Sequence, residues 1–156
     1  KPIVAAINGH AIAGGCMLAN ACDYRIMVTG KTKIGLNEVR IGASVFAGSV
    51  EMLKCAAGHR NAETILLDGG MYSADRAREL GLVDKVTTDD QLTADATDVA
   101  QRLASGSSRA FGSIKGLLHN PVAAEFDKRE QAAIDEFVDI WYSPETRELL
   151  KSVVIR

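Results

Sequence analysis

Hydrophobic positions in the first half of the chain alternate between short extended runs and helical spacing. Three apolar runs predict buried strands, at residues 1–8, 24–28 and 82–86. Helical spacing lies between them, at residues 16–22 and 44–57. Residues 32–42 mix extended and loop character. Strands that alternate with helices in this way predict an α/β core.

Capping residues predict the ends of further helices in this part of the chain. Asn61 is a suitable N-cap for a helix over residues 62–69, and Gly58 is a suitable C-cap for the helix before it. Ser73 is the predicted N-cap of the next helix, which ends at Gly81. Each predicted helix therefore has a start or stop signal of its own.

The second half of the chain has only helical patterns. Four apolar residues fall on one helix face with the spacing i, i+3, i+4 and i+7: Ile134, Phe137, Val138 and Trp141. A Ser-Pro-Glu run at 143–145 predicts the start of the last helix, and a bend is expected at 106–109. The order of the elements predicts an α/β core over residues 1–92 and a helical region over 93–156.

Composition and charge exclude several classes of partner. The 156 residues are 47% hydrophobic and 24% charged, with a net charge of −2 and no block of like charge. Nucleic acids and anionic membrane surfaces need a concentrated basic face, so neither is an expected partner. No apolar run approaches the ~20 residues that a membrane helix needs. We expect a cytoplasmic protein, or a mitochondrial or peroxisomal one in a eukaryote.

The cysteines and histidines do not predict a metal site. Cys16, Cys22 and Cys55 are odd in number and have no metal-ligand spacing, so we interpret them as reduced packing residues. The three histidines do not pair in a metal-binding pattern either. We expect no metal ion.

Ala13, Gly14 and Gly15 form a small-residue turn between a predicted strand and a predicted helix. Glycines allow a sharp turn and a close approach of a ligand to the backbone. The first N–H groups of a helix have no partner within the helix and carry partial positive charge. Such a turn can donate hydrogen bonds to an oxyanion. On composition alone, the later Glu38 reads as a solvated surface group.

Two longer runs resemble a known family, and the first of them contains the glycine turn. The run KPIVAAINGHAIAGGCMLANACDYRI at 1–26 resembles the central signature of the crotonase (enoyl-CoA hydratase/isomerase) family, and MYSADRARELGLVDKV at 71–86 resembles the segment that follows in that family. The resemblance implies a crotonase-like (ClpP/crotonase) spiral of β-β-α turns over residues 1–92. It also implies a helical trimerisation region over residues 93–156.

The resemblance further implies substrate, assembly and part of the site. The substrate is an acyl-CoA thioester, coenzyme A belongs to it, and no separate cofactor is expected. The expected assembly is a homotrimer or a dimer of trimers. Gly14 falls where the family has its second oxyanion donor. The first donor and much of the coenzyme A site are expected upstream of Lys1, so we expect the N-terminal part of the fold to be absent.

One departure from the family pattern bears on the reaction. Hydratases of the family use two glutamates, and this chain has Met17 at the position of the first and Glu38 at the second. The Δ3,Δ2-enoyl-CoA isomerases need only the later glutamate, which moves one proton between two carbons. The run IGLNEVRIG at 34–42 is also closer to the isomerases. We therefore expect an enoyl-CoA isomerase with Glu38 as its acid/base and Gly14 as an oxyanion donor.

The remaining candidates line the expected pocket. Ala13, Met17, Ile41 and Phe46 are the predicted substrate-binding residues, and an apolar wall from them would raise the pKa of Glu38. Lys115 and Arg109 are candidate partners of the coenzyme A phosphates, although an exposed helix face explains them equally well. A hydratase with a replacement acid, another crotonase-type lyase and a non-catalytic binding protein of this fold are the alternatives.

Overall fold

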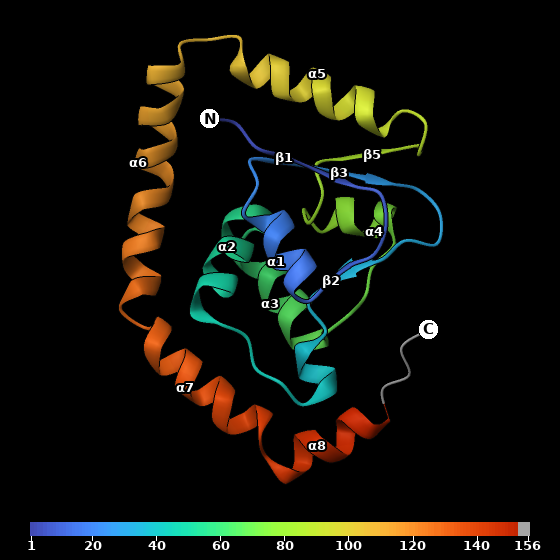
Figure 1. The fold of residues 1–156 in the computed structure, drawn as a ribbon, viewed down its shortest axis with the longest axis vertical. Coiled ribbons are helices and arrows are strands. Elements are labelled where there is room, and N and C mark those ends of the chain that lie inside the picture. Colours follow the sequence, from blue (N-terminus) through green and yellow to red (C-terminus); the bar gives the residue numbers. More distant parts are fainter. Residues whose placement is uncertain (153–156) are drawn as a thin grey trace.

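The computed structural model describes residues 1–152, and its elements alternate between strands and helices up to residue 87 before becoming purely helical (Figure 1). The strands are β1 (Val4–Ile7), β2 (Ala11–Ile12), β3 (Tyr24–Val28), β4 (Ile34–Gly35) and β5 (Lys85–Thr87). The first helices are α1 (Gly14–Asn20), the 3-10 turn η1 (Glu38–Ile41), α2 (Ala47–Ala57), α3 (His59–Asp68) and α4 (Ala74–Glu79). The last helices are α5 (Leu92–Ala104), α6 (Ser108–Asp127), α7 (Glu130–Trp141) and α8 (Pro144–Lys151).

A three-stranded parallel sheet with the order β1-β3-β5 forms the centre of the α/β part. Alternate side chains of a strand point to opposite sides, and those of the middle strand β3 are buried on both faces of the sheet. Ile26 and Val28 pack with Leu92 and Val99 of α5 on one face. Met27 packs on the other face with the residues of α1 to α4. The predicted α/β core is confirmed.

A second, very short sheet consists of β2 and β4, which run parallel to each other. The chain at residues 70–72 crosses this sheet closely, because Ile34 and Tyr72 exchange two backbone hydrogen bonds of 3.0 and 2.8 Å. A Cβ atom on Gly35 would lie only 2.1 Å from the carbonyl oxygen of Gly70. Glycine is therefore required at position 35 because of the backbone that passes over it.

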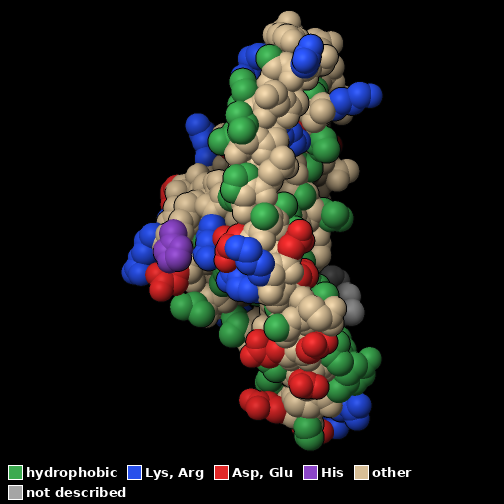
Figure 2. All heavy atoms as spheres, turned by 90° about the vertical axis from the view of Figure 1, so that its left-hand side faces the viewer, with side chains coloured by type: hydrophobic (Ala, Val, Ile, Leu, Met, Phe, Trp, Pro, Cys, Tyr) green, Lys and Arg blue, Asp and Glu red, His purple; other side chains and the backbone are tan. Residues whose placement is uncertain are grey.

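Helices α5 to α8 form an arc around the α/β part (Figure 1). Neither α6 nor α7 has a fully buried residue among the described ones. On α6, Ile114, Leu117 and Leu118 are exposed, and Figure 2 shows hydrophobic side chains interspersed with charged ones on the side that this helix forms. No helix in residues 1–152 is long and apolar enough to cross a membrane. The division at residues 92 and 93 stays a prediction, and residues 153–156 lie outside the described part.

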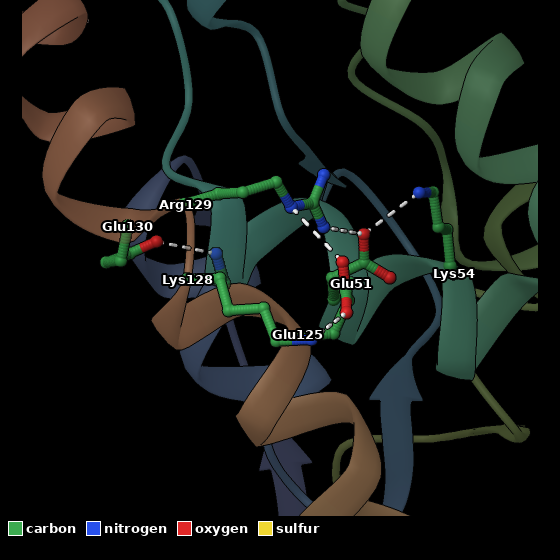
Figure 3. A network of polar contacts seen from close by, with 7 residues as sticks. Glu51, Lys54, Glu125, Lys128, Arg129 and Glu130 are labelled. Atoms are coloured by element: carbon green, nitrogen blue, oxygen red, sulfur yellow. Dashed lines mark hydrogen bonds and ion pairs between the residues drawn. The ribbon is translucent and has the colours of Figure 1, made fainter.

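Polar contacts join the arc to α2 at the junction of α6 and α7 (Figure 3). Helix α2 has no side-chain cap of its own, and Glu130 of α7 accepts a hydrogen bond of 2.9 Å from the buried N–H of Gly48. Arg129 pairs with Glu51 at 2.7 Å, and Lys54 pairs with the same carboxylate at 3.0 Å. These partners, Arg129 first, lower the pKa of Glu51 below its ordinary value. The start of α2 is thus capped by a residue 82 positions later in the chain.

Several predicted boundaries are wrong by a few residues. Helix α1 begins at Gly14 rather than residue 16, and α2 begins at Ala47 rather than residue 44. Asn61 does not cap α3, which begins at His59 with Gly58 as its N-cap residue. The strand predicted at 24–28 is confirmed as β3, whereas β1 and β5 are shorter than the runs at 1–8 and 82–86 that predicted them. The caps at Ser73 and Ser143 are confirmed, as is the bend before α6.

Replacement of Glu130 by alanine should destabilise the protein, because the buried N–H of Gly48 then loses its acceptor. The loss of a helix N-cap lowers the free energy of unfolding by about 1 kcal/mol. Urea unfolding followed by circular dichroism measures this loss. The matched control is Glu136→Ala, since Glu136 is an exposed glutamate of the same helix. Equal effects of the two substitutions would contradict the capping role of Glu130.

Candidate active site

The pairing of β2 with β4 brings the glycine turn and Glu38 to the same place. Ile12 lies opposite Gly35, and the two strands are parallel, so their carboxyl ends meet at one edge. Helix α1 begins just after β2 at Gly14, and η1 begins shortly after β4 at Glu38. The N–H of Ala13 donates a hydrogen bond of 2.9 Å to the carbonyl of Gly35. Residues 24 positions apart in the sequence therefore share one edge of the fold.

The first turn of α1 has free backbone donors. No side chain caps it, and within residues 1–152 the N–H groups of Gly14, Gly15 and Cys16 have no hydrogen-bond acceptor. Ala13 before it has φ 52°, a backbone conformation that residues other than glycine rarely adopt. A Cβ atom on Gly14 would meet nothing within 4 Å. Gly14 and Gly15 are exposed at this turn, whereas Cys16 is fully buried.

Glu38 is buried, which is contrary to the interpretation from composition. Only 6% of its surface is exposed, and its Oε2 atom has no hydrogen-bond partner among the described residues. Burial raises the pKa of this carboxyl above its ordinary value, because the charged form is poorly solvated there. A carboxyl with a raised pKa and one oxygen without a partner among the described residues is suited to exchange a proton with a bound molecule.

Cys16 and Asn20 lie behind the site on α1. Cys16 is fully buried, and its pKa is raised to about 12, first by burial and then by the negative charge of Glu38. A thiol with this pKa is not a nucleophile, so the prediction that Cys16 is a packing residue is confirmed. Asn20 donates a hydrogen bond to the sulfur at 3.7 Å, and its own Oδ1 atom has no partner among the described residues. No sequence pattern pointed to Asn20, because an asparagine in a helix is usually exposed.

The predicted pocket residues differ in what they pack against. Met17 is half-buried and packs against the main hydrophobic core. Ile41 is half-buried at the end of η1. Phe46 packs on Phe137 of α7, with 4.8 Å between the ring centroids, so one of its faces is already occupied by the C-terminal arc. The assignment of these residues to a substrate pocket stays a prediction.

A hollow of about 310 Å³ lies beside the glycine turn. It is formed by strand β1, the loop before β2 and the outer face of α1, including Gly15 and Leu18. Leu18, within α1, is 75% exposed. His10 on the rim is fixed because its Nδ1 atom accepts a hydrogen bond from the N–H of Lys33 at 3.1 Å. The open donors of α1 therefore have an apolar hollow next to them.

The other sequence candidates lie elsewhere. Lys115 forms an ion pair of 2.6 Å with Asp23, and Arg109 lies on the exposed surface at the start of α6. Cys55 is exposed and lines a hollow between α2 and α6, so its interpretation as a packing residue is wrong. Across residues 1–152, no cluster of three histidine, cysteine or acidic side chains has the arrangement of a metal site.

Comparisons with known proteins point to one family. Residues 1–152 match the family model described as enoyl-CoA hydratase/isomerase. The chain is 35% identical to mouse mitochondrial enoyl-CoA delta isomerase 1 over 136 residues, which is 86% of this chain and 47% of the mouse protein. It is 31% identical to the crotonyl-CoA hydratase of Syntrophomonas wolfei over 137 residues, which is 88% of this chain and 52% of that protein.

Solved structures agree with these relatives. The crystal structure of human mitochondrial delta3-delta2-enoyl-CoA isomerase superimposes with a TM-score of 0.88 at 29% identity, over 95% of this chain and 58% of the human chain. The crotonase-like fold expected from the sequence is confirmed. The chain spans about half the length of the curated relatives it matches.

The buried carboxyl predicts a pH-dependent stability. The raised pKa means that the folded protein keeps the Glu38 proton to a higher pH than the unfolded chain does. Its favourable contribution is thus complete below the ordinary pKa of 4.5 and is lost as the pH rises through the raised value. A difference of one pKa unit corresponds to about 1.4 kcal/mol.

Between pH 4 and pH 8, the free energy of unfolding should therefore fall less in Glu38→Gln than in the unsubstituted protein. Urea unfolding at both pH values measures the difference. Glu136→Gln, at an exposed position, is the matched control and should follow the unsubstituted protein. Parallel curves for Glu38→Gln and the control would show that the Glu38 carboxyl is solvated.

Proposed function

Because the chain belongs to the enoyl-CoA hydratase/isomerase family, we propose that it shifts a carbon–carbon double bond in an enoyl-CoA thioester, with Glu38 as the single acid/base. The observation that supports this most is the placement of Glu38. Its buried carboxyl, with one oxygen lacking a partner among the described residues, lies at the same strand edge as the open donors of α1. A proton acceptor and an oxyanion site are the two parts that enolate chemistry requires.

The proposed reaction begins with a 3-enoyl-CoA. The Glu38 carboxylate takes a proton from C2, and the electron pair moves onto the thioester oxygen to give a dienolate. The N–H of Gly14 donates a hydrogen bond to that oxygen as its charge develops. Glu38 then returns the proton to C4, which moves the double bond from C3–C4 to C2–C3. The proton and the electrons balance, and no other reactant is consumed.

Burial suits Glu38 to both proton transfers of this reaction. The carboxyl must be a base in the first step and an acid in the second, so a pKa between that of an ordinary carboxyl and neutrality serves both steps. Burial is the leading cause of the raised pKa. No cation is needed beside Glu38 in this scheme, and a cation there would lower the pKa again.

Met17 supports isomerisation over hydration. It stands on α1 next to the fully buried Cys16, and its thioether has no proton to exchange. Addition of water needs one carboxylate to activate the water while a second works beside it. With a methionine at this position, a second acid would have to come from another part of the protein.

Hydration of a 2-enoyl-CoA is the second candidate. The chain is about as similar to a crotonyl-CoA hydratase as to an enoyl-CoA delta isomerase, with 31% and 35% identity. Both reactions place negative charge on the thioester oxygen, a dienolate in the double-bond shift and a 3-hydroxyacyl enolate in hydration, so both use an oxyanion site. The comparison of the two activities in one preparation therefore separates the candidates.

Substrate and assembly follow from the same proposal. Coenzyme A enters as part of the substrate, and the reaction uses no separate cofactor. The predicted acyl pocket consists of Ala13, Met17, Ile41 and Phe46. A homotrimer or a dimer of trimers is the proposed assembly, and the exposed Ile114, Leu117 and Leu118 of α6 give it an apolar surface. The mitochondrial location belongs to the named mouse and human relatives.

Substitution of Glu38 by glutamine should abolish the double-bond shift, because the amide neither accepts nor returns the proton. Loss of a general acid/base lowers the rate by about 10²–10⁴. The assay follows the absorbance of the conjugated thioester with 3-enoyl-CoA, and the loss of that absorbance with 2-enoyl-CoA. Glu136→Gln should keep the full rate. A Glu38→Gln protein with undiminished activity would refute the role of Glu38, and rapid hydration of 2-enoyl-CoA would favour the second candidate.

Substitution of Gly14 by alanine should reduce activity and leave folding intact. The added methyl group meets no atom of the protein within 4 Å, but it occupies the space beside the open donors. We expect kcat/KM to fall by about 10²-fold, as when an oxyanion-site donor is lost. Gly112→Ala, another helical glycine with open space around its Cβ position, is the matched control. Equal activity in both variants would place the thioester oxygen elsewhere.

A further inference from the structure

The turn that carries Glu38 is held in place from the C-terminal helix. Gly42 ends this turn in a left-handed conformation with φ 73°, and its carbonyl oxygen accepts a hydrogen bond from the hydroxyl of Thr146 on α8. Thr146 is 1% exposed, which makes it one of the few buried polar residues of the described chain. The two residues are 104 positions apart, so this contact exists only when α8 is docked.

One peptide unit connects Thr146 with Glu38. The carbonyl of Gly42 and the N–H of Ala43 belong to the same peptide group, which is planar and rigid. The carbonyl accepts from Thr146, and the N–H donates a hydrogen bond of 2.9 Å to the carbonyl of Glu38. The orientation of this plane is thus fixed at one end by α8, and it fixes the backbone of Glu38 at the other.

The Thr146 hydroxyl is itself oriented by its neighbour. Ser143 caps α8 by accepting a hydrogen bond of 3.2 Å from the N–H of Thr146. The Ser143 hydroxyl in turn donates to the Thr146 hydroxyl at 3.1 Å, so the Thr146 proton is left for the carbonyl of Gly42. Hydrogen bonds in such a chain polarise and strengthen one another.

Close packing supports the same contact. A Cβ atom on Gly42 would lie 2.8 Å from Cδ1 of Leu149 and 3.1 Å from Oγ1 of Thr146. Helix α8 therefore rests directly on the end of η1, with no space for a side chain between them. Displacement of α8 would leave the Gly42 peptide without its donor and the turn without its support.

We propose that Thr146 is a positioning residue for Glu38, which it acts on through the Gly42–Ala43 peptide. The proposal rests on the proposed role of Glu38 as the acid/base. Thr146 does not touch the substrate in this scheme. Its hydroxyl keeps the buried carboxyl aimed at the carbons between which the proton moves.

Thr146→Val tests the proposal, because valine keeps the shape of the side chain and removes only the hydroxyl. We expect kcat for the double-bond shift to fall by about tenfold to a hundredfold, the effect of misplacing a reacting group, with KM nearly unchanged. Thr146→Ser should restore most of kcat, since it restores the donor. Thr97→Val on α5 is the matched control, because it removes an exposed threonine hydroxyl that also donates to a backbone carbonyl.

A second measurement is independent of activity. Amide hydrogen exchange followed by NMR should show the N–H of Ala43 exchanging at least about tenfold faster in Thr146→Val, while the amide of Ile26 in β3 is unchanged. Accelerated exchange in a protein that is inactive in its unsubstituted form would refute the proposed function and keep the structural link. Unchanged kcat with unchanged exchange at Ala43 would overturn the proposal.

If Thr146→Val does not fold, the unsubstituted protein itself provides the test. Its Ala43 amide must then be protected more strongly than the amides of exposed turns. Exchange as fast as in those turns would show that α8 does not hold the Glu38 turn, and would overturn the proposal as well.

Discussion

The site depends on the register of a two-residue parallel ladder. Ala11 and Ile12 pair with Ile34 and Gly35, and each strand leads directly into one half of the candidate site. A slip by one residue would shift β4 by about 3.3 Å and turn its side chains to the other face, and this would displace the turn that carries Glu38. The chain at residues 70–72 prevents this slip from the other side, because it bonds to Ile34 and leaves room only for glycine at position 35. A ladder too short to be stable alone is thus held by a third segment.

Glu38 differs from the other acidic groups near this ladder in its partners. Most acidic groups near the core have a cationic or backbone partner: Asp23 pairs with Lys115, Asp84 with Arg25, and Glu51 with Arg129. Glu38 is buried, and no cation among the described residues lowers its pKa. A buried ionised carboxylate is unfavourable, so burial favours the protonated form of this group. The same burial suits the carboxyl to the proposed acid/base role.

The sequence predicted the alternation of strands and helices well, because apolar runs and capping serines report local structure. Ser73 and Ser143 cap the helices that they were expected to cap. The start of α3 was missed, because Gly58, with a positive φ of 76°, serves as its N-cap residue while Asn61 lies inside the helix. The cap of α2 by Glu130 was not predictable, since no local pattern connects residues 48 and 130.

The site was predictable to a different degree. Gly14 and Glu38 were found through a family resemblance, and no spacing rule brings them together without the β2–β4 pairing. The burial of Glu38 comes from tertiary packing, so composition gave the opposite expectation. Asn20, Thr146 and the Gly42 contact were missed, because a threonine one turn into a helix has the same local pattern whether it is buried or exposed.

The arc of α5 to α8 has a consequence for the populations of the native state. Helices α6 and α7 have no fully buried residue in the described chain, so their detachment exposes little apolar surface and needs less free energy than global unfolding. Thr146 sits at the far end of this weakly held segment. Molecules in which α6 to α8 are detached keep the sheet, the ladder and both buried hydrophobic clusters, which contain no described residue of these three helices. They form a folded sub-population in which the Glu38 turn is misaligned. The size of this sub-population is set by the docking equilibrium of the C-terminal helices and not by the stability of the core.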